Sequence, residues 1–441
     1  MKTLLATAAM LLTLTQALQA AENKAAAVEH LPRLVAAAIA QNPELQASEA
    51  RWRMFASKAA QAGSLDDPMV MFKLQNLLVR DPLSFGGRDP NTAKVVGISQ
   101  QLPFWGKRSL REELAQHEAE AYRWTVEERK LELRRMVKET YYQLYAVDRA
   151  RQIVDKNLGI ISDLITIAES RYAVGQGVQT DIFKANLERS KMLDMQLTLQ
   201  QQRTSLAATM NFLLNRPAST PVGPIAEFEL PAPRPSADQL QTLAQEQRPQ
   251  LRSLHSQVNK AKTAHQLARK EAWPDVNLSF EYMFRERVAN GMANDPGYDM
   301  FTVGLTFNLP LQQERRRAMQ AESASETSMA SEELHNLNNG IRYSISENLA
   351  QLERRSRQTE LYRSGIIPQA AQTLESALIG YRVGKVDFPA VLEGRLNLFN
   401  YEREFLDAKA EYMINLARLE ATVGTELGPP PASEPTTPAN K

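Results

Sequence analysis

Apolar and polar residues alternate along the segment 275–286, DVNLSFEYMFRE, with almost no error. A period of two is typical of a strand with one apolar face and one polar face. The segment 299–309 alternates in the same way, and 68–79 and 93–103 do so more loosely. We therefore predict four strands. Each is long enough to cross a bilayer as a tilted strand, which takes roughly 9–11 residues. An amphipathic sheet in a soluble domain would show the same alternation.

Long helices are predicted between these strands. No proline occurs from residue 104 to residue 216, so the run 107–172 could form one helix of about 100 Å at about 1.5 Å per residue. From Leu133 to Tyr172, mostly apolar residues recur with the 4,3 spacing of a coiled-coil seam. In the second half of the chain, the spacing is kept only from Ile367 to Tyr381, and 314–357 is mostly polar. Such helices should pack lengthwise on neighbours.

Three landmarks occur twice, in the same order. NPEL and DDPM recur 206 residues later as RPQL and WPDV. VVGISQQLPFWGKR is matched by TVGLTFNLPLQQER at an offset of 207, and RYAVG is matched by GYRVG at an offset of 209. This order and the small drift indicate a tandem duplication.

Each repeat has the same predicted plan. The first repeat, 21–214, contains helices at 28–62, 107–172 and 179–214, a β-hairpin at 68–103 and a tip turn at 173–179. The second repeat, 237–428, contains helices at 237–272, 313–380 and 388–423, a β-hairpin at 275–309 and a tip turn at 381–387. We predict a Pro-rich linker at 215–236 and a disordered tail at 429–441.

The N-terminal residues 1–20 have the pattern of a signal peptide, with cleavage expected after Ala20. No later run reaches 18 apolar residues, so we predict no transmembrane helix. The chain has 52 Lys and Arg against 51 Asp and Glu. This balance argues against nucleic acid as a partner and against a polybasic membrane patch.

No enzyme chemistry is indicated. The chain has no Cys, so disulfides, thiolate nucleophiles and Cys-ligated metals are excluded. Its closest His pair, His255 and His265, lies ten residues apart, a spacing that does not predict a shared metal ion. GxSxG, HExxH and a Gly-rich phosphate loop are also missing. We predict no catalytic residue, no metal site and no cofactor.

Four strands cannot close a membrane barrel, for which about eight is the smallest number. Open strand edges are not tolerated in hydrocarbon, so several copies of the chain should share one barrel. Two copies give eight strands around an interior filled by side chains, and three give twelve strands around a lumen. The apolar strand face should then contact lipid, and the polar face should line a pore.

The duplicated strand ends VVGISQQLPFWGKR and TVGLTFNLPLQQERRR, with the duplicated RYAVGQGVQTD and GYRVGKVDFPA turns, resemble those of the TolC-like family of outer-membrane efflux channels. The resemblance implies a mostly helical homotrimer: a twelve-strand β-barrel in the outer membrane of a Gram-negative bacterium, continued by an α-helical periplasmic tunnel. It also implies an exit channel of a tripartite efflux system, docked to a periplasmic adaptor (membrane fusion protein) and an inner-membrane pump. The GSLDDPM and QQLPFWGKR segments resemble members paired with heavy-metal efflux pumps. Nothing in the residues identifies the substrate.

In that family the turns between the long helices dock adaptor hairpins and carry a gate. By position, the resemblance marks six candidate docking residues: Tyr172, Val174, Gly175, Tyr381, Val383 and Gly384. It marks three candidate gate residues, which could form an anionic ring: Asp181, Asp387 and Glu393. Each set has an ordinary alternative, because glycine commonly ends helices and acidic residues commonly begin them.

Two other functions remain open from the residues alone. A periplasmic adaptor also has a leader and a long helical hairpin, but needs several compact β domains. A soluble coiled-coil scaffold would be favoured if the strands never meet lipid. Four strands of membrane length favour the channel.

Overall fold

The computed structural model describes residues 28–77, 79, 91–231, 235–285 and 297–427. The predicted leader, 1–20, and the predicted tail, 429–441, lie outside the described residues. Within those ranges, none of the helices combines the length and apolarity that a bilayer crossing requires. The chain divides into two compact units. Unit 1 comprises residues up to Ala47, Glu127–Arg248 and the residues from Asn339 onward, whereas unit 2 comprises Ser48–Val126 and Pro249–Asn338.

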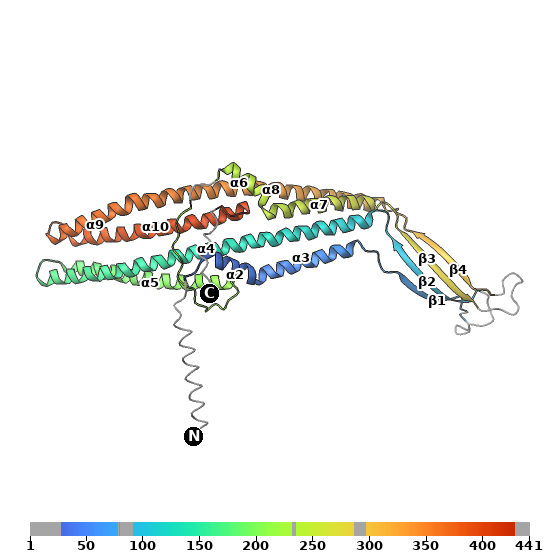
Figure 1. The fold of residues 1–441 in the computed structure, drawn as a ribbon, viewed down its shortest axis with the longest axis horizontal. Helices are drawn as coiled ribbons and strands as arrows, with labels where there is room; N and C mark the ends of the chain where they lie inside the picture. Colours follow the sequence, from blue (N-terminus) through green and yellow to red (C-terminus); the bar gives the residue numbers. More distant parts are fainter. Residues whose placement is uncertain (1–27, 78, 80–90, 232–234, 286–296, 428–441) are drawn as a thin grey trace, which may run out of the picture. The chain divides into compact units, whose positions relative to one another are not determined.

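The two repeats contain corresponding elements (Figure 1). The first has α2 (Leu31–Gln41), α3 (Pro43–Ala62), β1 (Met69–Gln75), β2 (Ala93–Leu102), α4 (Lys107–Ala173) and α5 (Gln179–Leu213). The second has α6 (Ala237–Gln247), α7 (Pro249–Lys270), β3 (Val276–Arg285), β4 (Met300–Phe307), α8 (Gln313–Leu361), a π-helical turn (Tyr362–Ile366), α9 (Ile367–Arg382) and α10 (Phe388–Val423).

The predictions of single helices over 28–62 and 237–272 are wrong, because each is two helices. The breaks fall at Asn42 and Arg248, whose backbones are extended, with φ and ψ of −69° and 121° and of −71° and 118°. Each precedes a proline, Pro43 or Pro249. Proline disfavours the α conformation in the residue before it and has no N–H to continue a helix. The duplication has therefore preserved the break in both repeats.

The two break residues also hold the ends of the last helices of their repeats. Asn42 donates from Nδ2 to the carbonyl of Leu213 at 3.2 Å. Arg248 donates from Nη1 to the carbonyl of Thr422 at 2.8 Å. Different side chains thus satisfy terminal carbonyls that have no partner within their own helix.

The prediction of one helix over 313–380 is also wrong in detail, because a π-helical turn interrupts it. The N–H of Ile367 donates to the carbonyl of Tyr362, five residues back. Pro368 follows directly and cannot donate to the carbonyl four residues before it. A wider turn at this point removes the clash of the proline ring with the preceding turn.

The core of unit 1 follows the predicted coiled-coil seam of α4. Val137, Leu144, Val154 and Ile161 are fully buried. Val154 and Ile161 belong to a cluster with α5, α9 and α10, whereas Val137 and Leu144 belong to a second cluster with α2, the ends of α5 and α10, and the linker. Tyr172, at the end of the seam, is exposed. Burial of apolar side chains along these helices is the main stabilising contribution.

Unit 2 carries the strands, which form one four-stranded antiparallel sheet within the described residues, in the order β1-β2-β3-β4. Each repeat contributes one hairpin. The hairpins join through β2 and β3, which pair from Ala93 opposite Arg285 to Leu102 opposite Val276. Among the helices of unit 2, Phe55 of α3 stacks on Tyr122 of α4, and small buried residues join α7 to α8.

Asn42→Ala should lower the free energy of unfolding by about 1–3 kcal/mol. The change removes the bond to Leu213 and the two hydrogen bonds that the Asn42 side chain accepts from the N–H groups of Glu44 and Leu45. Thermal unfolding of the purified protein measures the effect. Asn400→Ala, at an exposed position of α10, is the matched control and should change stability little. Equal effects of the two changes would contradict this role for Asn42.

Candidate functional site: the sheet and the tip turns

One face of the sheet is apolar and exposed. The strand register places Phe72, Val96, Tyr282 and Phe301 in one row across the four described strands. Phe72 is 79% exposed and Phe301 is 69% exposed. The adjacent row has the same character and consists of Val70, Ile98, Phe280 and Val303. A contiguous apolar face of this kind is a site for lipid or for another protein.

The opposite face is mixed and more polar, as the alternation predicted. Lys73 on β1 reaches Glu281 on β3 at 3.9 Å, across β2. This contact passes over Gly97, where a Cβ would lie 3.1 Å from Cγ of Glu281. Gly304 is close to Ser279 in the same way, since a Cβ there would lie 2.4 Å from the hydroxyl oxygen. Glycine therefore makes room for polar side chains on this face.

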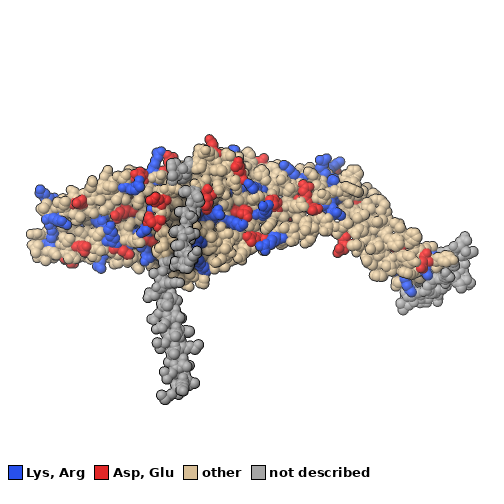
Figure 2. Space-filling model, viewed as in Figure 1, with Lys and Arg blue, Asp and Glu red and all other residues tan. Residues whose placement is uncertain are grey.

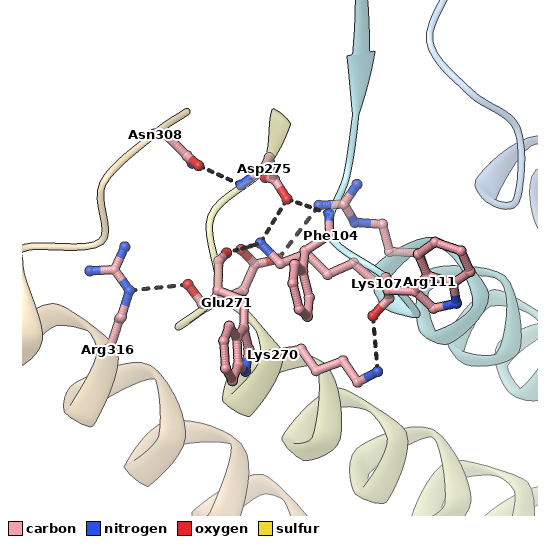
Figure 3. A network of polar contacts seen from close by, with 10 residues as sticks. Phe104, Lys107, Arg111, Lys270, Glu271, Asp275, Asn308 and Arg316 are labelled. Carbon is pink, nitrogen blue, oxygen red and sulfur yellow. Dashed lines mark hydrogen bonds and ion pairs between the residues drawn. The ribbon is translucent and has the colours of Figure 1, made fainter. Parts of the chain in front are cut away.

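A buried lysine connects the two repeats where the sheet meets the helices (Figure 3). Lys107, at the start of α4, is 1% exposed. Its Nζ donates to Glu271 Oε2 at 3.1 Å, to the carbonyl of Trp273 at 2.9 Å and to Asp275 Oδ1 at 2.9 Å. The N–H of Phe104 also donates to Asp275 Oδ1, at 2.8 Å. All three ammonium donors of Lys107 are thus satisfied.

Aromatic packing supports this junction. Phe104 and Trp273 stack with ring centroids 5.0 Å apart. Lys270 donates to the carbonyl of Trp105 at 3.0 Å, and Gly106 adopts a left-handed φ of 83° beside it. Sequence reasoning missed this network, although its residues lie in or directly before the LPFWGK and AWPD segments that mark the duplication. Only the paired strands bring the two segments together.

The two tip turns have the same backbone geometry. Gly175 and Gly384 both have φ of 73°. The N–H of Gly175 donates to the carbonyl of Tyr172, and the N–H of Gly384 donates to that of Tyr381. In each turn the next residue also donates to the carbonyl five positions back. These paired bonds define a Schellman motif, for which glycine is the favoured residue.

The environments of the two turns differ, however. Tyr172 is 47% exposed, whereas Tyr381 is only 8% exposed. The guanidinium of Arg171 lies 4.1 Å from the centroid of the Tyr381 ring and donates to the Tyr381 carbonyl at 2.8 Å. Phe388 packs edge-on against the same ring. The side chain of Tyr381 is therefore not on the docking surface that the sequence suggested, whereas Val174 and Val383 are exposed.

The candidate gate residues lie beside these turns. Asp181 is in the first turn of α5, and Asp387 caps α10 by accepting from the N–H of Ala390 at 3.3 Å. Partial burial raises the pKa of Asp181, and the charge of Asp387 raises it further against the opposing effect of Lys184. Asp181 and Asp387 thus interact, whereas Glu393 is exposed and makes no hydrogen bond or ion pair with the described part of the chain.

Metal ligands do not cluster in the described ranges, where no group of three or more His, Asp or Glu side chains could hold an ion.

Comparison with known proteins places this arrangement in a family. The sequence profile of the family described as outer membrane efflux protein matches residues 34–216 and 240–425, so the chain belongs to this family. The two matched ranges correspond to the two repeats. No curated protein sequence matches the chain.

Solved structures show the same fold. The outer membrane protein VceC of Vibrio cholerae aligns with a TM-score of 0.75 and 18% identity over 90% of this chain and 96% of its own. A membrane protein of Pseudomonas aeruginosa aligns with a TM-score of 0.75 and 17% identity, covering 91% and 92%. The open state of the MtrE outer membrane channel of Neisseria gonorrhoeae aligns with a TM-score of 0.72 and 17% identity, covering 90% and 89%.

Family membership decides between the functions that the residues left open. The chain is an outer-membrane efflux protein, and not an enzyme, a periplasmic adaptor or a soluble scaffold. The resemblance seen in the sequence is confirmed.

Arg171→Gln should loosen the contact with the second turn. The change removes the cation–π contact and the donors to the carbonyls of Tyr381 and Arg382. Loss of about 1–2 kcal/mol of local stability would speed amide exchange in residues 381–386 by roughly 5- to 30-fold, measured by hydrogen–deuterium exchange. Arg189→Gln, an exposed position on α5, is the control. Unchanged exchange in the first variant would show that Arg171 does not hold this turn.

Proposed function

We propose that three copies of the chain form one exit channel, with their sheets joined in a twelve-strand barrel in the outer membrane and their helices forming a tunnel in the periplasm. The observation that carries this proposal is the sheet, because one face is apolar and exposed while β1 and β4 are edge strands in the described structure.

The edges make association of copies necessary. In hydrocarbon each backbone group without a partner costs several kcal/mol, so β4 of one copy must pair with β1 of the next. Two copies would close eight strands around an interior filled by side chains. Three copies close twelve strands and leave a lumen lined by the face that carries Lys73, Glu281 and Thr302.

The tip turns support docking of a periplasmic adaptor, which in turn contacts an inner-membrane pump. Tyr172, Val174 and Val383 are exposed apolar side chains on turns whose backbone is held by Gly175 and Gly384. Exposed apolar residues on a rigid turn are suited to packing against a partner helix, which would bury them. Tyr381 would take part only after Arg171 has moved from its ring.

The same turns support a gate. Arg171 connects the end of α4 to the end of α9, so this contact would have to break if the two helix pairs move apart. Asp181 and Asp387 interact beside it, and three copies would place at least six carboxyl groups around one axis. Such a ring would favour cations and concentrate negative charge.

Substrate selection would lie mainly in the pump and the adaptor, because a wide wet lumen offers few specific contacts. The heavy-metal efflux type stays a prediction.

Phe301→Arg should prevent insertion into the outer membrane. An arginine on the lipid face costs roughly 2–4 kcal/mol at the bilayer midplane, and the trimer would carry three. Thr302→Arg is the matched control, since the next residue on β4 points to the opposite face. Fractionation of cell envelopes and heat-modifiable migration on gels measure insertion. Equal insertion of both variants would contradict the proposed lipid face.

Cation selectivity of the purified channel should fall as the pH is lowered. The fall should begin at a higher pH than for an aspartate with the ordinary pKa, because the raised pKa of Asp181 lets its carboxylate take up a proton, and lose its charge, at a higher pH. Asp387→Asn removes the charge that helps to raise this pKa, so the remaining transition should move to lower pH. Single-channel reversal potentials measure the selectivity.

Asp238→Asn, at an exposed position on α6, is the control for the gate and should leave the pH profile unchanged. The double variant Asp387→Ala, Glu393→Ala tests the wider ring. Cation selectivity equal to that of the original chain would remove these two residues from the gate.

A further inference from the structure

Exposed apolar side chains continue past the ends of the strands, toward the helices. Trp105 follows β2 and is 90% exposed, and Leu309 and Leu311 follow β4 and are also well exposed. They lie outside the strand register, so they are not part of the apolar rows of the sheet. Tryptophan in such a position is typical of the boundary between a bilayer and water.

Basic side chains gather at the same junction (Figure 2). Arg108, Arg269 and Arg315 are exposed and have no acidic partner in the described part of the chain. Their neighbours Arg111 and Arg317 are paired with Glu271 and Glu314. Three guanidinium groups are therefore available to an anion. We refer to Arg108, Arg269, Arg315, Trp105, Leu309 and Leu311 as the collar.

Contacts between the segments hold the collar together. Lys270, next to Arg269, donates to the carbonyl of Trp105 at 3.0 Å. Arg316, next to Arg315, donates from Nε to the carbonyl of Glu271 at 3.0 Å. The starts of α4 and α8 and the end of α7 are thus tied to one another. The collar is a surface built from both repeats.

Local helix electrostatics do not account for two of these arginines. Arg108 and Arg315 lie in the first turns of α4 and α8, where the positive end of the helix dipole disfavours a cation. Neither has a carboxylate partner in the described residues that would offset this cost. An external anion would do so, and guanidinium groups match phosphate geometry well.

We infer that the collar binds the headgroups of anionic phospholipids in the leaflet that faces the helices. This inference rests on the proposed membrane location of the sheet. The apolar members decide between lipid and free phosphate, because a free anion would use the arginines but not Trp105, Leu309 and Leu311.

Lipid enrichment tests the collar. The full-length protein is inserted into vesicles of equal phosphatidylcholine and phosphatidylglycerol and extracted in mild detergent, and the lipid that copurifies is quantified. Each arginine near an anionic surface contributes about a fivefold preference. The original chain should therefore enrich phosphatidylglycerol. In the triple variant Arg108→Gln, Arg269→Gln, Arg315→Gln, the enrichment should fall by a factor of about five or more.

Two matched variants separate specific binding from general charge effects. Arg33→Gln, Arg189→Gln, Arg354→Gln removes the same charge from exposed positions of α2, α5 and α8 and should keep the enrichment. The triple change of Arg108, Arg269 and Arg315 to Lys keeps the collar charge and should also keep most of it. Equal loss in the first control, or no loss in the collar variant, would overturn the inference.

Two further arms distinguish the sources of failure. Inorganic phosphate, compared with chloride at equal ionic strength, should not displace the lipid; displacement would identify a free-anion site and overturn the lipid assignment. Insertion into vesicles of phosphatidylcholine alone tests the sheet without the collar. A chain that inserts there but shows no enrichment contradicts only the collar, whereas a chain that inserts into neither vesicle contradicts the proposed function, and the collar inference with it.

Discussion

The constraint on which the structure depends is that backbone groups and apolar side chains cannot both be satisfied by one copy of this chain. The described sheet exposes rows of Phe, Val, Leu and Ile on one face, and its strands β1 and β4 have open edges. In water the backbone groups of the edges could form hydrogen bonds, but the apolar face would be exposed at a cost. In lipid the apolar face would be favourable, but the backbone groups of the edges would have no partners. A closed sheet in lipid would satisfy both, so the proposed barrel links assembly to membrane insertion.

The duplication makes such a sheet possible, and the junction around Lys107 fixes how its halves join. A buried ammonium is costly unless it is paired and hydrogen-bonded. In the described part of the chain, Nζ of Lys107 in the first repeat donates to Glu271, Trp273 and Asp275 of the second. Another register of β2 against β3 would separate these groups and leave the charge buried without partners. The network therefore acts together with strand pairing to select one register.

At the other functional region, one motif occurs twice in different surroundings. Both turns end a helix with a left-handed glycine, which makes their backbones alike. Arg171 covers Tyr381, but no equivalent arginine covers Tyr172 in the described structure. In GYRVG the arginine follows the tyrosine, whereas in RYAVG it precedes it. A shift of two positions thus gives the two turns different surfaces on the same backbone.

The sequence by itself determined the features that depend on local periodicity: the alternation in 275–286, the coiled-coil seam of α4 and the duplicated turns that led to the family. Pro43, Pro249 and Pro368 also mark the helix breaks in the sequence, although periodicity alone does not predict them. The pairing of β2 with β3, the burial of Lys107 and Tyr381, and the gathering of Arg108, Arg269 and Arg315 were decided by the tertiary structure. In each case the residues that come together lie far apart in the chain. Composition, net charge and periodicity therefore carry no information about which residues meet.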